Sequence, residues 1–353
     1  MEYLWQYLLF FAKVLTVLAA ALVVLARLAA MVAQRRGPRE PTLQVLRLNT
    51  QRRKLIRAVQ RQLLAPKAFE ELIKADRAAA KARLKGKPLP SSEPEKSRLF
   101  VLDYKGDLRA SQTEALRHEV TAVIGAARPG DQVLLRLESP GGVVHGYGLA
   151  ASQLERLRDA GLQLTVAVDQ VAASGGYMMA VVAHQIVAAP FAVVGSIGVV
   201  AQIPNVHRWL QRRDIDVELV TAGKHKRSLT VLGPNTPEGR EQMQREITEI
   251  HELFKAAVAK FRPQLDLVEV ADGRSWYGTA ALELHLVDTL ETSDAWLGRM
   301  LEECDGFAVR WRAGQGVGSK LSGWVAQTLG RATEAALLRT WRRLDRADAV
   351  QHR

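Results

Sequence analysis

Hydrophobic and polar positions divide the chain into four stretches of different character. Residues 1–33 contain an almost continuous apolar run that begins at Leu4, whereas residues 34–97 combine aliphatic residues with many arginines and lysines. In residues 98–300, short apolar runs alternate with longer amphipathic segments, and residues 301–353 place leucines and tryptophans among arginines. The pattern predicts a membrane anchor, a basic juxtamembrane helical segment with a linker, one main folded domain and a basic amphipathic tail.

The apolar run at residues 4–33 is long enough to span a membrane. A spanning helix needs about 20 predominantly apolar residues, and this run contains only four polar or charged ones. A cleaved signal peptide is the alternative, but no basic region precedes the run. We therefore expect a transmembrane helix that is retained as an anchor.

Positive charge is concentrated directly after this run. Residues 34–97 hold 17 lysines and arginines against six acidic residues, which accounts for nearly all of the net charge of +12. A basic block beside an apolar segment favours anionic lipid headgroups as the partner. The block has one aromatic residue, Phe69, and no recognisable nucleic-acid motif, so we expect no nucleic acid. The positive-inside rule places the block and the domain that follows in the cytoplasm.

The main domain shows strand-like runs alternating with helical patterns. Prolines mark residues 86–94 as the linker before it, and the tail after it fits either a membrane surface or the surface of the domain. Strands are expected at residues 99–102, 133–137, 164–168, 186–189 and 217–220. Helices are expected at residues 34–85, 111–127, after residue 142 to about 158, after residue 174, and at 237–261.

This alternation predicts an α/β fold of parallel βαβ units. Ser111 and Glu114 have the spacing of a capping box at the start of the helix at 111–127. The apolar stretch at 181–200 is interrupted by Pro190 and Gly195, so we interpret it as buried strands and turns rather than a second membrane span.

Candidate chemistry lies in two glycine-containing turns that follow predicted strands. Ser174 precedes Gly175 and Gly176 at the expected start of a helix, where unpaired backbone N–H groups surround the serine. Gly141 and Gly142 follow the strand at 133–137. Because ligands bind at the carboxyl edge of parallel sheets, one of these two glycine amides together with the Gly175 amide is expected to form an oxyanion hole.

A lysine can complete this site as the general base. It must be uncharged for this role, which burial favours. Lys226 follows the strand expected at 217–220 through a turn at Gly223, so we expect it to point inward, and we prefer it to Lys224. Cys304 is the only cysteine, and neither a zinc-binding motif nor a nucleotide-binding loop is present, so we expect no metal and no cofactor.

Together, these segments resemble peptidase family S49, the signal peptide peptidase A group. The resemblance covers most of the chain and is carried by Ser139-Pro140-Gly141-Gly142, Ala173-Ser174-Gly175-Gly176-Tyr177, Val194-Gly195-Ser196-Ile197-Gly198-Val199, Ala222-Gly223-Lys224-His225-Lys226-Arg227 and Gly273-Arg274 with Trp276-Tyr277-Gly278.

The resemblance implies a ClpP/crotonase-like fold, a homo-oligomer and a Ser-Lys dyad that cleaves membrane-associated or leader peptides. It implies that Ser174 is the nucleophile, Lys226 the general base and Ser196 the residue that orients the lysine. It also implies an inner-membrane location with work at the outer face, opposite to the side that the charge rule indicates. Two other readings remain open: a non-catalytic scaffold of the same fold that binds a membrane partner, and a crotonase-type acyl-CoA enzyme.

Overall fold

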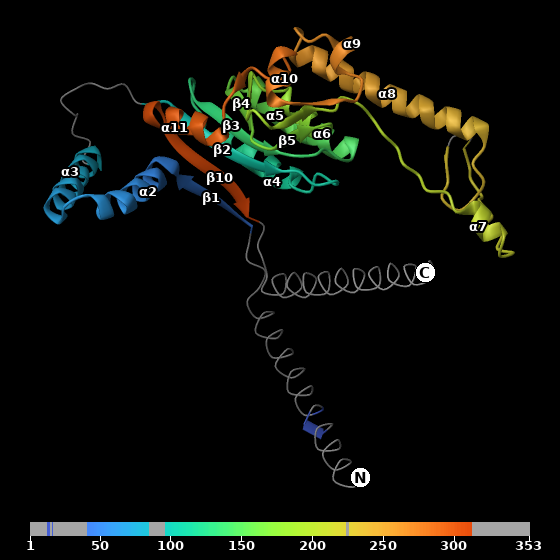
Figure 1. Cartoon of the computed structure of the whole chain (residues 1–353), viewed down its shortest axis with the longest axis horizontal. Coiled ribbons are helices and arrows are strands. Elements are labelled where there is room, and N and C mark those ends of the chain that lie inside the picture. Colours follow the sequence, from blue (N-terminus) through green and yellow to red (C-terminus); the bar gives the residue numbers. More distant parts are fainter. Residues whose placement is uncertain (1–12, 15, 17–40, 85–95, 224–225, 313–353) are drawn as a thin grey trace, which may run out of the picture. The chain divides into compact units, whose positions relative to one another are not determined.

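The computed structural model describes residues 13, 14, 16, 41–84, 96–223 and 226–312 (Figure 1). The chain divides into two compact units, Met1–Thr42 with Arg312–Arg353, and Leu43–Trp311. Within the described residues, no helix is both long enough and apolar enough to cross a membrane. All but three residues of the anchor expected at 1–33, the linker expected at 86–94 and most of the tail expected at 301–353 lie outside the described residues. These three segments stay predictions.

A seven-stranded sheet forms the centre of the Leu43–Trp311 unit (Figure 1). Its strands are β1 (Thr42–Arg47), β2 (Arg98–Lys105), β3 (Gln132–Glu138), β4 (Gln163–Val168), β6 (Gln185–Ala188), β9 (Thr289–Leu290) and β10 (Asp305–Arg312). Their order is β1-β10-β2-β3-β4-β6-β9, and the pairs from β10 to β9 are all parallel. The expected α/β fold with parallel strands is confirmed.

Helices bury both faces of this sheet. One face is covered by α4 (Thr113–Ala126), α5 (Val144–Asp159), α6 (Gly175–Ala180) and the end of α8 (Pro237–Phe261), and α11 (Ser293–Glu303) packs on the other. Alternate residues of β2 point to opposite sides, as the pleat of a strand requires. Leu102 lies in the larger core with Phe254, and Val101 lies in the smaller core with Trp296.

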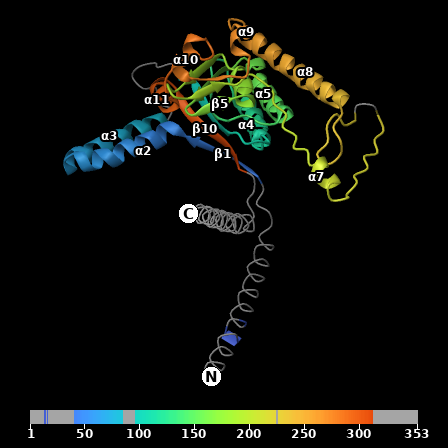
Figure 2. The ribbon, with the colours of Figure 1, turned by 45° about the vertical axis from the view of Figure 1, so that its right-hand side comes forward.

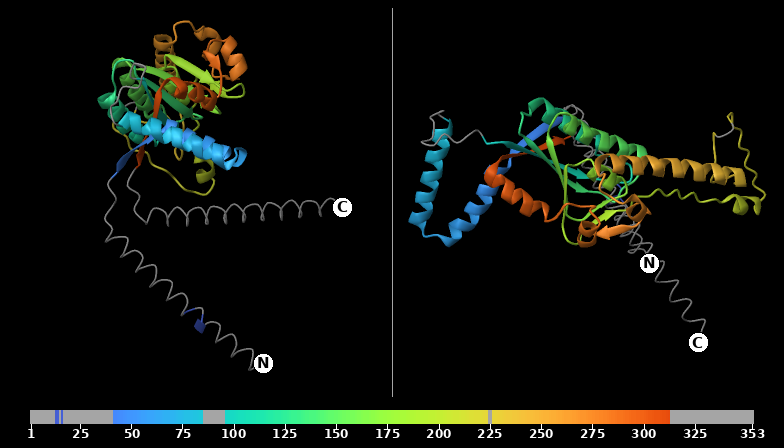
Figure 3. Two further views of the ribbon diagram at one scale, coloured as in Figure 1. Left: turned by 90° about the vertical axis from the view of Figure 1, so that its left-hand side faces the viewer. Right: turned by 90° about the horizontal axis from the view of Figure 1, so that it is seen from above.

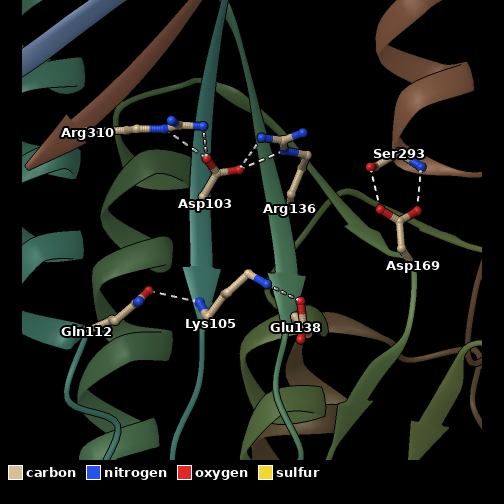
Figure 4. Close-up of polar contacts among 8 residues, drawn as sticks. All are labelled: Asp103, Lys105, Gln112, Arg136, Glu138, Asp169, Ser293 and Arg310. Atoms are coloured by element: carbon tan, nitrogen blue, oxygen red, sulfur yellow. Dashed lines mark hydrogen bonds and ion pairs between the residues drawn. The ribbon is translucent and has the colours of Figure 1, made fainter. Parts of the chain in front are cut away.

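Polar side chains hold the α11 side of the sheet together beyond the apolar contacts (Figure 4). Asp103 of β2 accepts hydrogen bonds from Arg136 of β3 at 2.6 Å and Arg310 of β10 at 2.8 Å. Burial alone would raise the pKa of Asp103, but the two guanidinium groups lower it overall. Asp169, directly after β4, accepts hydrogen bonds from the backbone N–H and the hydroxyl of Ser293. These bonds attach the start of α11 to the end of β4.

A smaller sheet lies beside the carboxyl end of β3. It consists of β5 (Val171–Ala173), β7 (Val193–Gly195) and β8 (Ser275–Tyr277), with β5 parallel and β8 antiparallel to β7. A parallel bridge between Ser139 and Ala172 joins it to the end of β3. Two short helices, α9 (Leu267–Val270) and α10 (Gly278–Glu283), flank β8 in sequence.

The N-terminal part of the unit differs from the helix expected at 34–85. Residues 42–47 form β1, an edge strand beside β10, and only then do α2 (Leu48–Leu63) and α3 (Pro66–Leu84) follow. The prediction of a helix was wrong for residues 42–47. These residues form a strand because they pair with β10, which lies near the other end of the domain sequence. Asn49 fastens the start of α2, because its side chain bonds to Leu301, Cys304 and Gly306.

Residues 199–236 leave the smaller sheet and extend toward the outer end of α8, as Figures 1, 2 and 3 show. The described part of this segment, residues 199–223 and 226–236, contains one short helix, α7 (His207–Gln211). The strand expected at 217–220 is not formed, and this prediction was wrong. The apolar run there is not buried against a sheet, since the side chain of Val220 is 92% exposed.

Candidate active site

Ser174 occupies a strained turn between β5 and α6. Its backbone has φ 51° and ψ −119°, in a region that residues other than glycine rarely adopt. The turn is held on both sides, because the Ser174 N–H donates to the Gly195 carbonyl at 2.8 Å and its carbonyl accepts from Met178 at 2.9 Å. The residue is half-buried. A serine at such a strand-to-helix turn presents its hydroxyl at the start of the helix.

The two glycines after Ser174 leave no room for a side chain. A methyl group on Gly175 would overlap the ring of Tyr147, and one on Gly176 would lie 2.6 Å from the Ser139 carbonyl oxygen. As the first residue of α6, Gly175 has no partner within the helix for its N–H. No other hydrogen bond from that N–H is recorded among the described residues.

The loop after β3 meets this turn. Gly141 has φ +90°, and a methyl group on it would lie 2.8 Å from the Cβ of Ser174. Its N–H donates to the Ser139 hydroxyl at 3.1 Å. The Gly142 N–H has no recorded partner in the described part of the chain. The structure therefore brings Gly141 against Ser174 and Gly175, with Gly142 as the next residue of the same loop.

Ser196 follows Gly195, the residue whose carbonyl accepts the Ser174 N–H. It has φ 52°, and its N–H donates to the Arg274 carbonyl at 2.6 Å. The residue is half-buried. The serine expected to orient the lysine therefore lies directly after β7 of the smaller sheet, next to the residue that bonds to the Ser174 turn.

Lys226 is in a different environment. It is exposed, and its backbone N–H donates to Gly223 at 3.1 Å. Two residues later, the Ser228 hydroxyl donates to Glu246 in the first half of α8. The core residues of that helix, Phe254 and Val258, lie in its second half. In the described residues, no hydrogen bond joins Lys226 to Ser174. This single chain does not bring the proposed base to the proposed nucleophile.

Sequence reasoning missed the side chains that support the two glycine turns. Tyr147 and Ser139 are fully buried, and their hydroxyl oxygens are 2.6 Å apart. Tyr147 is the fourth residue of α5 and lies on its buried face. Helical spacing predicts a core residue there, but it does not predict the hydrogen bond to Ser139. The described residues hold no group of three His, Cys, Asp or Glu side chains placed to bind a metal ion.

Comparisons with known proteins identify the family. The model of the N-terminal part of peptidase family S49 matches residues 2–154, and the model of peptidase family S49 matches residues 156–305. A Haemophilus influenzae protein described as "Probable protease SohB" is 54% identical over 220 residues, which cover 62% of each chain. A Buchnera aphidicola protein with the same description is 57% identical over 196 residues, 56% of this chain and 64% of the relative. The matched region thus spans less than two thirds of each relative.

A solved membrane-bound, stomatin-specific protease aligns with a TM-score of 0.34 and 14% identity, over 59% of this chain and 80% of the other. That likeness is too distant to support an inference about this chain. The two consecutive family matches, by contrast, cover most of the sequence and contain both glycine turns and Ser174. The chain belongs to peptidase family S49.

Proposed function

We propose that this chain is a serine peptidase that cleaves peptide bonds through an acyl-enzyme on Ser174. The observation that carries the proposal is the contact between the Ser174 turn and the loop at Gly141 and Gly142. A serine on a strained turn lies beside the Gly175 and Gly142 amides, which have no hydrogen-bond partner among the described residues, and this supports a site for acyl transfer. The architecture fits a ClpP/crotonase-like fold.

The two unengaged amides serve as the oxyanion hole in this proposal. The Gly141 N–H is bonded to Ser139, so the Gly142 and Gly175 N–H groups are the donors. Removing one such donor from a serine peptidase typically costs about a hundred- to a thousandfold in rate. Preorganised donors are effective because they need no rearrangement as charge develops on the substrate oxygen.

Lys226 acts as the general base, with Ser196 orienting its amine. Lys226 takes the proton of the Ser174 hydroxyl as Oγ attacks the peptide carbonyl carbon. The resulting ammonium returns that proton to the leaving amine as the C–N bond breaks. Water then attacks the acyl-enzyme and gives a proton to Lys226, the C–Oγ bond breaks, and the proton passes back to Ser174.

We propose that assembly of copies brings the lysine to the serine. Residues 199–236 expose large apolar side chains, including Val200 at 89%, Trp209 at 55% and Val220 at 92%. Tryptophan is enriched at contacts between subunits, and exposed apolar surface can mark such contacts. In a homo-oligomer, this segment of one copy reaches the nucleophile turn of the next, and Lys226 loses its exposure there.

Two single variants and their mixture test the proposal. Ser174→Ala and Lys226→Ala should each reduce cleavage of casein or of a leader peptide at least about a thousandfold. Co-expressed in one oligomer, the two variants should recover about a quarter of the parent activity if the dyad joins two copies, because only that share of junctions pairs an intact serine with an intact lysine. Full activity in either single variant would refute the dyad, and a failure to recover would place both residues in one copy.

The family assignment favours a peptidase over the two alternatives. Labelling of Ser174 by a fluorophosphonate in the parent protein, lost in Ser174→Ala, would exclude a non-catalytic scaffold. Hydrolysis of an acyl-CoA ester without peptidase activity would instead support the crotonase-type enzyme.

We further propose that the protein works at a bacterial inner membrane, on membrane-associated or leader peptides. The anchor at 4–33 and the basic block at 34–97 would contact lipid. Leu55, Val59 and Leu63 lie four residues apart along α2, so they share one helix face, and all three are more than half exposed. The same helix has five arginines and lysines and no acidic residue. An exposed apolar stripe on a basic helix is typical of helices that lie in an anionic lipid surface.

An environment-sensitive fluorophore tests this lipid contact. In a Cys304→Ser background, the label is attached to Val59→Cys, or to Arg57→Cys on the opposite helix face as the matched control. In nanodiscs that contain phosphatidylglycerol, emission should shift to the blue at position 59 and not at position 57. Equal spectra at both positions would contradict the contact, and a shift that depends on protein concentration in detergent would assign the stripe to another copy.

A further inference from the structure

A chain of hydroxyl groups links the oxyanion loop to a buried tyrosine. The Gly141 N–H lies 3.1 Å from Ser139 Oγ, Ser139 Oγ lies 2.6 Å from Tyr147 Oη, and Tyr147 Oη lies 2.9 Å from the Asp107 carbonyl oxygen. The Ser139 and Tyr147 side chains are fully buried. The four residues come from three separate segments: the loop after β2, the loop after β3 and the first turn of α5.

The direction of this chain follows from counting hydrogens. A tyrosine hydroxyl carries one hydrogen, and here it is donated to the Asp107 carbonyl. Tyr147 Oη must therefore accept from Ser139, whose hydroxyl in turn accepts from the Gly141 N–H. All three bonds run the same way, from the glycine amide to the backbone carbonyl. Burial raises the pKa of Tyr147, so its hydroxyl keeps the hydrogen that this direction requires.

The same side chain also touches the other glycine turn. A methyl group on Gly175 would overlap the ring of Tyr147, so the ring lies directly against that residue's backbone. A methyl group on Gly106 would overlap the hydroxyls of Ser139 and Tyr147, so the loop after β2 closes over them. Tyr147 thus contacts both segments that supply the proposed oxyanion donors. Its hydroxyl bonds to Ser139 in the loop of Gly142, and its ring packs against Gly175.

Further hydrogen bonds hold the far end of the chain, at Asp107. The Asp107 carboxylate accepts hydrogen bonds from the N–H groups of Arg109 and Ser111 and from the Ser111 hydroxyl. The next carbonyl in this loop, that of Leu108, accepts from the Val143 N–H at 2.9 Å. The loop after β2 therefore fastens the oxyanion loop twice, once through Tyr147 and once through the backbone directly after Gly142.

We propose that Tyr147 is a positioning residue for the oxyanion hole. Through Ser139 it holds the Gly141 N–H away from substrate, and this fixes the peptide plane of the loop so that the Gly142 N–H is the donor. The inference rests on the proposed peptidase function, because an oxyanion hole has a role only if Ser174 attacks a carbonyl group. It adds a residue that makes no contact with the reacting atoms and acts on them through a backbone.

Tyr147→Phe tests this role, with Tyr104→Phe as the matched control. Tyr104 is also fully buried, its hydroxyl lies 3.2 Å from Thr113, and its ring packs edge-on at 6.4 Å from that of Tyr147. Both variants lose one buried hydroxyl, but only Tyr147→Phe breaks the chain to Gly141. We expect kcat on a fluorogenic peptide to fall about ten- to a hundredfold in Tyr147→Phe with KM within about threefold, and to change less than about twofold in Tyr104→Phe.

A peptide aldehyde separates positioning from a general loss of stability. Its adduct with Ser174 carries an oxygen in the oxyanion hole, so its affinity should fall in Tyr147→Phe by a factor similar to kcat. Binding of the uncleaved peptide to Ser174→Ala should be the same with and without the second change at Tyr147. Ser139→Ala, which removes the middle hydroxyl, should give the same pattern, and the double variant should lose little more than either single one.

The outcomes distinguish the inference from the function beneath it. A parent protein that neither cleaves peptides nor reacts with a fluorophosphonate would refute the peptidase function. A parent that is active, with Tyr147→Phe as active as Tyr104→Phe, would overturn the role of Tyr147 and leave the function intact. If Tyr147→Phe does not fold, the same comparison of kcat and aldehyde affinity in Ser139→Ala decides the question.

Discussion

The turn that carries Ser174 and the segment that carries Lys226 are held very differently by the same chain. Ser174 has backbone hydrogen bonds on both sides and glycine neighbours with no space for a methyl group. Among the described members of residues 199–236, only His207–Gln211 form a helix, and Lys226 is exposed. The fold of one chain therefore fixes the Ser174 turn and the loop at Gly141, whereas it leaves Lys226 exposed. In the proposed function, contacts outside that chain place this lysine.

This difference has an energetic basis. A serine with positive φ costs about 1–3 kcal/mol, which persists only where the surroundings determine the conformation. The buried strands β3 and β5 and the two glycine turns supply such surroundings. Residues 199–236 bury little apolar surface against the domain, so little free energy is available to fix one conformation of Lys226 within a single copy.

Alanine at two glycines with positive φ should give the largest contrast between the regions. Gly141→Ala puts a methyl group 2.8 Å from both the Ser174 Cβ and the Ala173 carbonyl oxygen, at φ +90°. Gly223→Ala has a similar φ of +98°, but among the described residues its methyl group meets just the Lys226 Cβ, at 4.0 Å. We expect kcat/KM to fall about a thousandfold in Gly141→Ala and less than about tenfold in Gly223→Ala.

The two glycine variants are compared by peptide cleavage and by labelling of Ser174. Both substitutions place an alanine at positive φ, so Gly223→Ala controls for the backbone cost itself. Equal losses at the two sites would show that the Lys226 segment is as tightly determined as the nucleophile turn, and the comparison would break down.

Local patterns predicted several elements closely. The helix expected at 237–261 is α8 from end to end, because Thr236 caps its start by accepting from Gly239, and Pro237 is its first residue. Four strands of the central sheet, β2, β3, β4 and β6, were predicted to within about three residues because they are buried runs flanked by turns. The other three strands, β1, β9 and β10, were not predicted.

Features that depend on distant partners could not be predicted. The expected capping box of Ser111 and Glu114 was wrong, because the Ser111 hydroxyl bonds to Asp107 and α4 begins at Thr113. For the site, motif order indicated Ser174 and the glycines that the structure brings together. The hydroxyl chain through Tyr147 depends on three segments that meet only in the folded domain, and no local spacing indicates it.

Helix α8 belongs to both regions, and two neighbouring residues on it should separate them by stability. Phe254 is 2% exposed in the larger core, whereas Leu253 is 67% exposed on the outer face. Phe254→Ala should lower the free energy of unfolding by about 3–5 kcal/mol, because it leaves a cavity in the core. Leu253→Ala should change it by less than about 0.5 kcal/mol. Urea unfolding in detergent, followed by tryptophan fluorescence, measures both, and a large loss in Leu253→Ala would show that another copy covers this face.

A buried acid should give the domain a pH dependence that the exposed segment lacks. Glu119 on α4 is 5% exposed, and its carboxylate accepts from the Trp311 N–H at 2.6 Å. Burial, with a smaller contribution from the charge of Asp103, raises the pKa of Glu119 from 4.5 to about 7. Glu218, in the segment that carries Lys226, is exposed and serves as the control.

The sign of the effect follows from proton uptake. Between pH 4.5 and about 7 the folded protein holds a proton on Glu119 that the unfolded chain has lost, so stability falls as the pH rises through this window. The slope from this one group is at most about 1.4 kcal/mol per pH unit. Glu119→Gln keeps the oxygen that accepts from Trp311 and removes the titration, so its unfolding free energy should decline less than that of the parent across the window. Glu218→Gln should follow the parent at every pH. Parallel curves for all three proteins would show that burial does not raise the pKa of Glu119.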